Sequence, residues 1–286
     1  MTSTDSFYGM VAFGMQLHFD ASGRVNGFTG AAWRGLVGQV LHQAVCGHPT
    51  PVCTTCPGVS ACVYANLFKP LLDSALQPFW LHGWSRQPSG WSVGIRWLGN
   101  HNEYAIGEWL GALASNNHGC LLGGLPARLD HARCAATNQL SWSCQKGWQV
   151  SPQALRLLPQ RNAPSQCRVR CQTPLVSKHD GDPLFGALHT RLQRLIQQHG
   201  DGQKLPRPLQ PWHCHVEMQQ EQRMNLSKRF MVGRLMTMVL SDMDEDAWSM
   251  LIAGLELHAG GQTSMGCGQY VIEPFLPPVD LLKPTP

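Results

Sequence analysis

Charged residues are scarce in this chain of 286 residues, where only 14% are Asp, Glu, Lys or Arg and 43% are hydrophobic. Such a composition excludes an intrinsically disordered chain, which combines high charge with low hydrophobicity. No apolar run reaches the ~18 residues that a membrane-spanning helix requires. The first residues also lack the basic start and long apolar core of a signal peptide. We therefore expect a globular, cytoplasmic protein that does not associate with a membrane.

Acidic residues are missing from two long stretches. Residues 21–72 contain none, and residues 109–179 contain eight basic residues but a single acid, Asp130. The acids gather instead at residues 242–246. This uneven distribution favours one basic face that binds a polyanion such as RNA. Scattered, solvated basic side chains are the alternative interpretation of the same pattern.

Cysteine, in contrast, is abundant, with 11 residues. The odd number argues against a framework built only of disulfides, and we expect reduced thiols. Four of them lie close together in the sequence, at Cys46, Cys53, Cys56 and Cys62. Four thiolates in so short a span can hold structural zinc or an iron–sulfur cluster. Because the spacing is not that of paired C-x2-C knuckles, a loop with half-buried thiols is the alternative.

Hydrophobic periodicity predicts two successive β-α-β-β-α-β units. In the first unit the strand patterns fall at residues 7–19, 77–84, 91–98 and 139–143, and the helix patterns at residues 29–45 and 104–114. In the second unit the strand patterns fall at residues 167–173, 212–221, 229–240 and 269–273, and the helix patterns at residues 183–199 and 244–258.

These patterns predict an α+β fold with two tandem ferredoxin-like (RRM-like) domains. We place the domains at residues 1–150 and 165–276, with a cysteine-containing insertion at residues 46–62 in the first. Asp182 and Pro183 are typical of the cap and first residue of a helix. Alternation in the strand at 167–173 places its arginines on one face and its small apolar residues on the other.

A glycine-rich loop at residues 260–268 precedes the last predicted strand. Glycine permits left-handed backbone and leaves no side chain between the peptide N–H groups and a ligand. A cluster of N–H donors that face one way suits a phosphate group, although glycines often only turn the chain. The candidate RNA-binding residues in this loop are Gly260, Gly261, Thr263, Ser264, Gly266 and Gly268. A branched residue at Gly266 or Gly268 is expected to weaken RNA binding and to leave most of the fold intact.

The first predicted helix carries Gly35, Gly38 and His42 on one face, with Arg34 beside them. Two glycines inside a helix cost about 1 kcal/mol each relative to alanine. The chain must therefore gain something from close approach at this face. Either another element packs tightly against it, or a ligand lies against its backbone.

Three stretches match the motif pattern of one known family, in the right order along the chain. The first comprises residues 30–42, the cysteines running into residues 62–70, and residues 77–79. The second comprises residues 173–176 and 181–184, and the third residues 260–270. On these motifs the chain resembles the CRISPR-associated repeat-processing endoribonucleases of the RAMP superfamily. Together the three stretches span most of the chain.

The resemblance implies metal-independent cleavage of CRISPR precursor RNA, after which the mature guide RNA stays bound. The ribose 2′-hydroxyl attacks the adjacent phosphate, which requires a base, an acid and cations for the phosphorane charge. The family most often has histidine where this chain has Gln39, so His42, one turn further, is the expected base. Arg34 and Arg24 complete the expected catalytic group, and no cofactor is needed for the reaction.

Repeat RNA, mature crRNA and other CRISPR effector subunits are the expected partners. The expected RNA-binding residues outside the glycine-rich loop are Arg128, Arg133, Arg168, Arg170 and Lys178. Weaker candidates for the base are His18, His48 and His179. Gln39 favours an alternative function, a non-catalytic RNA-binding scaffold subunit of an effector complex. A zinc or cluster-containing redox protein is a third interpretation, which explains neither the glycine-rich loop nor the charge pattern.

Overall fold

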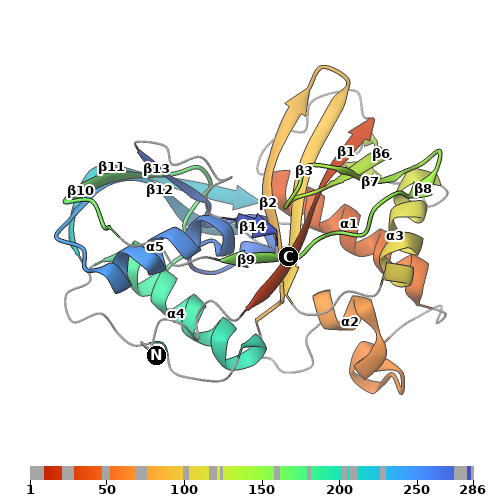
Figure 1. The fold of residues 1–286 in the computed structure, drawn as a ribbon, viewed down its shortest axis with the longest axis horizontal. Helices are drawn as coiled ribbons and strands as arrows, with labels where there is room; N and C mark the ends of the chain where they lie inside the picture. Colours follow the sequence, from red (N-terminus) through yellow and green to blue (C-terminus); the bar gives the residue numbers. More distant parts are fainter. Residues whose placement is uncertain are drawn as a thin grey trace. The chain divides into compact units, whose positions relative to one another are not determined.

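The computed structural model consists of two compact units, one made mainly of residues 12–155 and the other mainly of residues 156–283 (Figure 1). The structure describes residues 10–20, 29–46, 52–68, 76–98, 103–115, 121–122, 125–157, 162–178, 182–200, 205, 212–225, 230–273 and 282–284. None of the helices in these ranges has the length and apolar character needed to span a bilayer.

The first unit contains one β-α-β-β-α-β motif. Its elements are β1 (Val11–Asp20), α1 (Thr29–Val45), β2 (Phe79–Gln87), β3 (Gly90–Leu98), α3 (Glu103–Ser115) and β6 (Arg128–Cys134). The four strands are antiparallel and lie in the order β2-β3-β1-β6. This arrangement is ferredoxin-like.

Smaller elements surround this motif. They are α2 (Val63–Phe68), the hairpin of β4 (Leu121–Leu122) and β5 (Leu125–Pro126), and the strands β7 (Leu140–Ser143) and β8 (Gly147–Trp148), which extend the sheet beyond β6. The short strands β9 (Leu155–Leu157) and β14 (Leu282–Pro284) fall at the boundaries between the two units in the sequence.

The predicted fourth strand of the first unit was wrong. Residues 140–143 form β7, which pairs with β6, and it is β6 that pairs with β1. The sequence pattern of β6 does not indicate a strand, because Leu129 and Ala132, three positions apart, are both buried in the core. A regular strand would bury every second residue.

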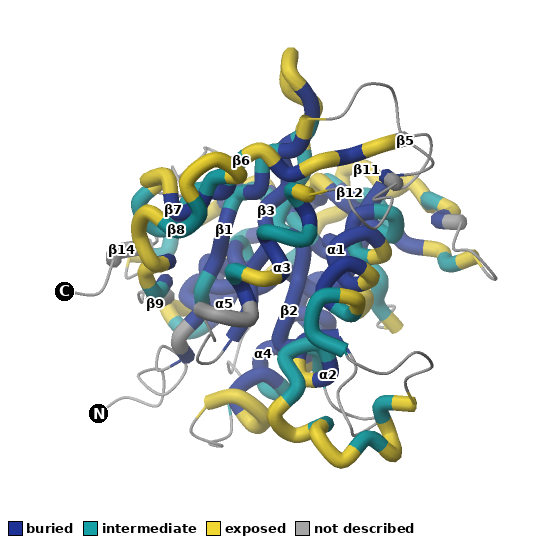
Figure 2. The backbone as a smooth tube through the Cα atoms, turned by 90° about the vertical axis from the view of Figure 1, so that its right-hand side faces the viewer, coloured by how far each residue is buried: buried dark blue, intermediate teal, exposed yellow. Residues whose placement is uncertain are grey.

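Aromatic residues fill the core of the first unit between the sheet and its helices. Trp33 of α1, Trp97 of β3 and Trp109 of α3 are buried in one cluster. The indole Nε1 of Trp109 donates a hydrogen bond of 3.0 Å to the carbonyl oxygen of Val37. Figure 2 shows the central strands β1, β2 and β3 as mostly buried, whereas α1 has buried, intermediate and exposed residues. Packing of this kind stabilises α1, the helix that carries Arg34 and His42.

The second unit repeats the motif as predicted. Its elements are β10 (Gln166–Cys171), α4 (Pro183–His199), β11 (His213–Asn225), β12 (Phe230–Ser241), α5 (Glu245–Leu257) and β13 (Tyr270–Glu273). The strands form an antiparallel sheet in the order β11-β12-β10-β13. The carboxylate of Asp182 accepts a hydrogen bond from the Phe185 N–H, so it caps α4 as expected. The α+β prediction with two ferredoxin-like units is confirmed.

Candidate functional site

Arg34 and His42 lie along the same side of α1, against α2. The ring centroid of His42 is 4.6 Å from that of Tyr64 in α2. Tyr64 stacks on Phe68, one turn further along α2, and the Arg34 guanidinium lies 5.7 Å from the centre of the Phe68 ring. Arg34 also donates a long hydrogen bond of 3.4 Å to Gln77. An imidazole, a phenol and a guanidinium are thereby gathered on one surface.

Gly38 is the point at which the two helices approach each other. A Cβ atom at this position would lie 3.0 Å from two carbon atoms of the Phe68 ring. A Cβ at Gly35 would meet nothing within 4 Å. Tight packing, one of the two expected reasons for the glycines, therefore accounts for Gly38, and the exposed face at Gly35 stays open.

Burial determines the direction of two pKa values in this cluster. It lowers the pKa of the Arg34 guanidinium, and Tyr64 acts in the opposite direction. Burial also raises the pKa of the Tyr64 phenol, as does nearby Cys53, and Arg34 opposes them. At neutral pH Tyr64 therefore keeps its proton and can donate it, while an arginine stays cationic. The cluster thus combines a proton donor and a cation with the His42 imidazole.

Sequence reasoning did not single out Tyr64, which lies in an apolar stretch after the cysteines. Its signal was its position within the family motif that follows the cysteines, but nothing local in the sequence places it beside His42. Gln39 lies on the exposed side of α1. Arg24, His48 and His179 lie outside the described residues.

The four cysteines of the insertion flank this cluster. Burial is the main cause that raises the pKa of Tyr64, and Cys53, Cys46 and Cys62 raise it further. Cys46, Cys53, Cys56 and Cys62 are free and partly buried. Within the described residues, no three His, Cys, Asp or Glu side chains are placed to share a metal ion. The thiols have the right chemistry for zinc but not the geometry, so a structural metal stays a prediction.

The glycine-rich loop packs against residues 173–176. The N–H of Gly261 donates to the Val176 carbonyl oxygen at 2.9 Å, and that of Gly268 to the Pro174 carbonyl oxygen at 3.0 Å. The Thr173 hydroxyl donates to the Gly266 carbonyl oxygen at 2.7 Å. Two stretches that the family pattern singled out, far apart in the sequence, are therefore in direct contact.

These hydrogen bonds correct the expectation that the loop offers a row of free N–H donors. Besides Gly261 and Gly268, Gly266 donates its N–H within the loop, to the Thr263 carbonyl oxygen. Thr263 and Ser264 are buried. The glycines are needed for the backbone itself, because Gly260, Gly266 and Gly268 have φ angles of 74°, 78° and 76°. RNA contact by this loop stays a prediction, and its exposed residues are Gly261 and Gln262.

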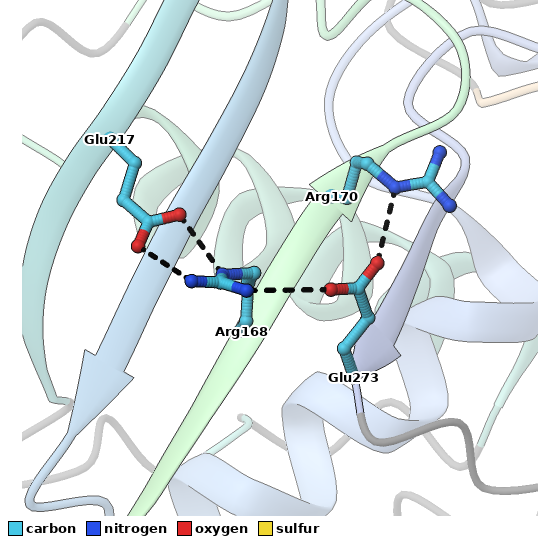
Figure 3. Close-up of polar contacts among 4 residues, drawn as sticks. All are labelled: Arg168, Arg170, Glu217 and Glu273. Carbon is cyan, nitrogen blue, oxygen red and sulfur yellow. Dashed lines mark hydrogen bonds and ion pairs between the residues drawn. The ribbon is translucent and has the colours of Figure 1, made fainter.

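Arg168 and Arg170 are exposed on β10, as predicted, but both are paired with acids (Figure 3). Arg168 makes two contacts of 3.0 Å with the Glu217 carboxylate. Arg170 donates a hydrogen bond of 3.3 Å to Glu273, whose other oxygen lies 4.0 Å from Arg168. Hydrogen bonding to Glu217 raises the pKa of Arg168. The positive charges of the two arginines are therefore balanced by two carboxylates, with which a phosphate must compete.

The remaining expected RNA-binding residues are spread over both units. Arg128 is exposed on β6, and Arg133 of the same strand donates to the Asn138 carbonyl oxygen at 3.0 Å. Lys178 is exposed beyond the segment that holds the glycine-rich loop. Of the expected catalytic residues, the structure brings together Arg34 and His42.

Comparisons with known proteins agree with this architecture. A family model described as the AF_1859_N N-terminal domain matches residues 9–105. Similar solved structures include a Cas6 product complex, with 16% identity, a TM-score of 0.53, and 92% of this chain and 99% of that chain covered. Thermus thermophilus Cas6 has 15% identity and a TM-score of 0.51, with 92% and 98% covered.

A chain of a partial Cas6-RT-Cas1–Cas2 complex has 9% identity and a TM-score of 0.51, with 92% of this chain and 46% of that chain covered. A comparison with curated protein sequences found no match. The chain therefore has the fold of the Cas6 proteins, the CRISPR-associated group that its sequence motifs resemble.

Proposed function

We propose that the protein binds CRISPR repeat RNA and cleaves it without a metal ion, and that the mature guide RNA stays bound. The fold of Cas6 structures, one of which is a product complex, supports RNA as the ligand. The observation that carries catalysis is the gathering of Arg34, His42 and Tyr64 on one surface of α1 and α2. We also propose that the protein associates with other CRISPR effector subunits.

Each of the three side chains has a distinct part in the proposed reaction. His42 accepts the proton of the ribose 2′-hydroxyl, and the resulting oxygen attacks the adjacent phosphorus. The bond from phosphorus to the 5′-oxygen breaks, which leaves a 2′,3′-cyclic phosphate. Tyr64, kept protonated by its raised pKa, donates its proton to the departing 5′-oxygen. Arg34 stabilises the charge that builds on the phosphoryl oxygens.

A substrate in which the attacking hydroxyl is removed tests this function directly. Purified protein is incubated with repeat RNA in EDTA, alongside the same RNA with a single 2′-deoxy nucleotide at the cleavage position. We expect cleavage of the first RNA, equal binding of both, and no cleavage of the second. Cleavage of the deoxy substrate, or a requirement for a metal ion in folded protein, contradicts the proposal.

The exposed Gln39 favours the second candidate, a non-catalytic scaffold that holds processed RNA. Glutamine cannot accept a proton at the position where the resembling family most often has histidine. In this case repeat RNA binds with an affinity well above that of unrelated RNA but stays intact in the same assay. The two functions therefore predict the same specific binding of repeat RNA, but only the nuclease predicts its cleavage.

A further inference from the structure

Several polar side chains lie on the face of the first unit's sheet opposite its helices, among them Gln16 of β1, which donates to Ser92 of β3. Met15, Leu17 and Phe19 of β1 are buried in the core with α1 and α3. Because alternate residues of a strand face opposite sides, His18 lies on the other face. It is paired across the sheet with His131 of β6, and the two imidazole rings stack with centroids 4.3 Å apart and planes 10° from parallel.

A β-bulge places an acid beside this stack. His18 pairs with His131 and Phe19 pairs with Leu129, so Asp130 has no partner on β1. In a regular strand the side chains of neighbouring residues point to opposite faces. A bulge changes the direction of a side chain, so Asp130 and His131 can lie side by side. Here the Asp130 carboxylate lies 2.8 Å from Nδ1 of His131. Since a carboxylate only accepts hydrogen bonds, Nδ1 is the donor and the orientation of the ring is set.

The ring of His18 forms an apolar support beneath His131. Burial is the main cause that lowers the His18 pKa, with His131 and Arg133 acting in the same direction and Asp130 opposing them. Its Nε2 is buried and makes no hydrogen bond. His18 is therefore neutral at pH 7, and its ring supports the stack as an aromatic plane rather than as a cation.

The His131 side chain is partly exposed. On the side away from His18, its cross-strand neighbour on β7 is Ser143, whose side chain is small. The Asp130 side chain is 54% exposed, and that of His131 is 27% exposed. A flat ring can stack on His131 while Asp130 accepts a hydrogen bond from its edge. A carboxylate repels a phosphate, so the charge at this position selects a base with an amino group.

We propose that His131, supported by His18 and oriented by Asp130, is a subsite for one unpaired nucleobase that carries an exocyclic amino group. The base stacks on the imidazole, and its amino group donates to Asp130, while Arg128 and Arg133 on the same strand contact the flanking phosphates. This inference rests on the RNA binding of the proposed function. The subsite lies on the sheet face opposite α1, so it recognises RNA away from the cleavage residues.

Cytosine and uracil provide the matched pair for a test, because they differ in the amino group at position 4. Binding of oligo(rC) and oligo(rU) to the full chain is measured by fluorescence anisotropy. We expect wild-type protein to prefer oligo(rC). Asp130→Asn should remove this preference, since an amide can also donate to the uracil oxygen. His131→Ala should weaken binding of both by roughly tenfold, and His131→Phe should retain it. His213→Ala, an exposed histidine of the second unit, is the control.

Thermal melting of each variant shows whether the fold is intact. Equal affinity of wild-type protein for the two oligonucleotides, or unchanged affinity in a folded His131→Ala variant, overturns the subsite. If His131→Phe binds repeat RNA but loses cleavage, His131 takes part in the reaction, and its assignment to a subsite away from the cleavage residues is wrong. If wild-type protein does not cleave repeat RNA, the proposed nuclease function is wrong. A preference for cytosine that depends on Asp130 would still support the subsite in that case.

Discussion

At the scale of the residue, His42 is the position on which the catalytic proposal depends. Its ring lies against Tyr64 and on the same side of α1 as Arg34. We expect His42→Ala to lower the cleavage rate by roughly 10²–10⁴, the usual size of a general-base contribution. The affinity for repeat RNA should change little, because the imidazole acts on the reacting hydroxyl. Single-turnover cleavage and a binding assay measure the two quantities.

Gln43→Ala is the control for this variant, because Gln43 is the exposed neighbour on the same helix. It should cleave at the wild-type rate. If folded His42→Ala does so as well, His42 is not the base. Positioning and charge stabilisation by Arg34 would then be the better account of the reaction.

Gly268 shows how a residue type can be required by the fold rather than by a ligand. Its φ is 76°, and a Cβ atom would overlap the Ala259 carbonyl oxygen. We expect Gly268→Val to lower the free energy of unfolding by about 1–3 kcal/mol or more. This differs from the expectation, drawn from the sequence, that most of the fold would stay intact. Chemical denaturation measures the change.

Gly261→Ala is the matched substitution in the same loop. Gly261 is exposed, and a Cβ atom there would make only ordinary contacts of 3.7 Å with Val176. The stability of this variant should be close to that of the wild type. A Gly268→Val protein as stable as Gly261→Ala, with reduced RNA binding, would restore the view of the loop as a ligand cradle.

At the scale of the element, β10 presents its arginines on an exposed face together with acids from β11 and β13. Glu217 binds Arg168 through both carboxylate oxygens. If RNA phosphates contact this face, Glu217→Gln should raise RNA affinity, because the substitution removes a competing negative charge. Arg168→Ala should lower it. Affinities measured at two salt concentrations report the change in ionic contacts. Unchanged affinity in both variants means that this face does not touch RNA.

The metal content of purified protein tests the role of the cysteine insertion. If Cys46, Cys53, Cys56 and Cys62 close around an ion, purified protein contains near-stoichiometric zinc or iron. Chelation should then lower the melting temperature, since metal binding contributes folding free energy. Elemental analysis that finds no metal favours the alternative, a loop with half-buried thiols.

At the scale of the whole molecule, RNA binding should depend strongly on salt. Cations that contact phosphates release counterions from the RNA, so affinity falls steeply as the salt concentration rises. Repeat RNA should also bind more tightly than an unrelated oligonucleotide at physiological salt. Titrations at several salt concentrations test both statements. Equal affinity for the two RNAs at physiological salt contradicts specific recognition of the repeat.

Local patterns determined the architecture of this protein. The helix of Arg34 and His42, the Asp182 cap of α4 and the alternation of β10 all follow from periodicity and capping within a few residues. Such signals depend on neighbours in the sequence, so the sequence alone contains them. The order of these elements was enough to predict two ferredoxin-like units.

Only the tertiary structure decided which chemical groups meet. Arg168 and Glu217 are 49 residues apart in sequence, and Arg170 and Glu273 are 103 apart. The contact of Tyr64 with His42 and the packing of the glycine-rich loop on residues 173–176 are also long-range. The bulge at Asp130 is invisible in the sequence because it arises from the register between β1 and β6. Residue types name the candidates for a site, but strand register and helix packing place them beside one another.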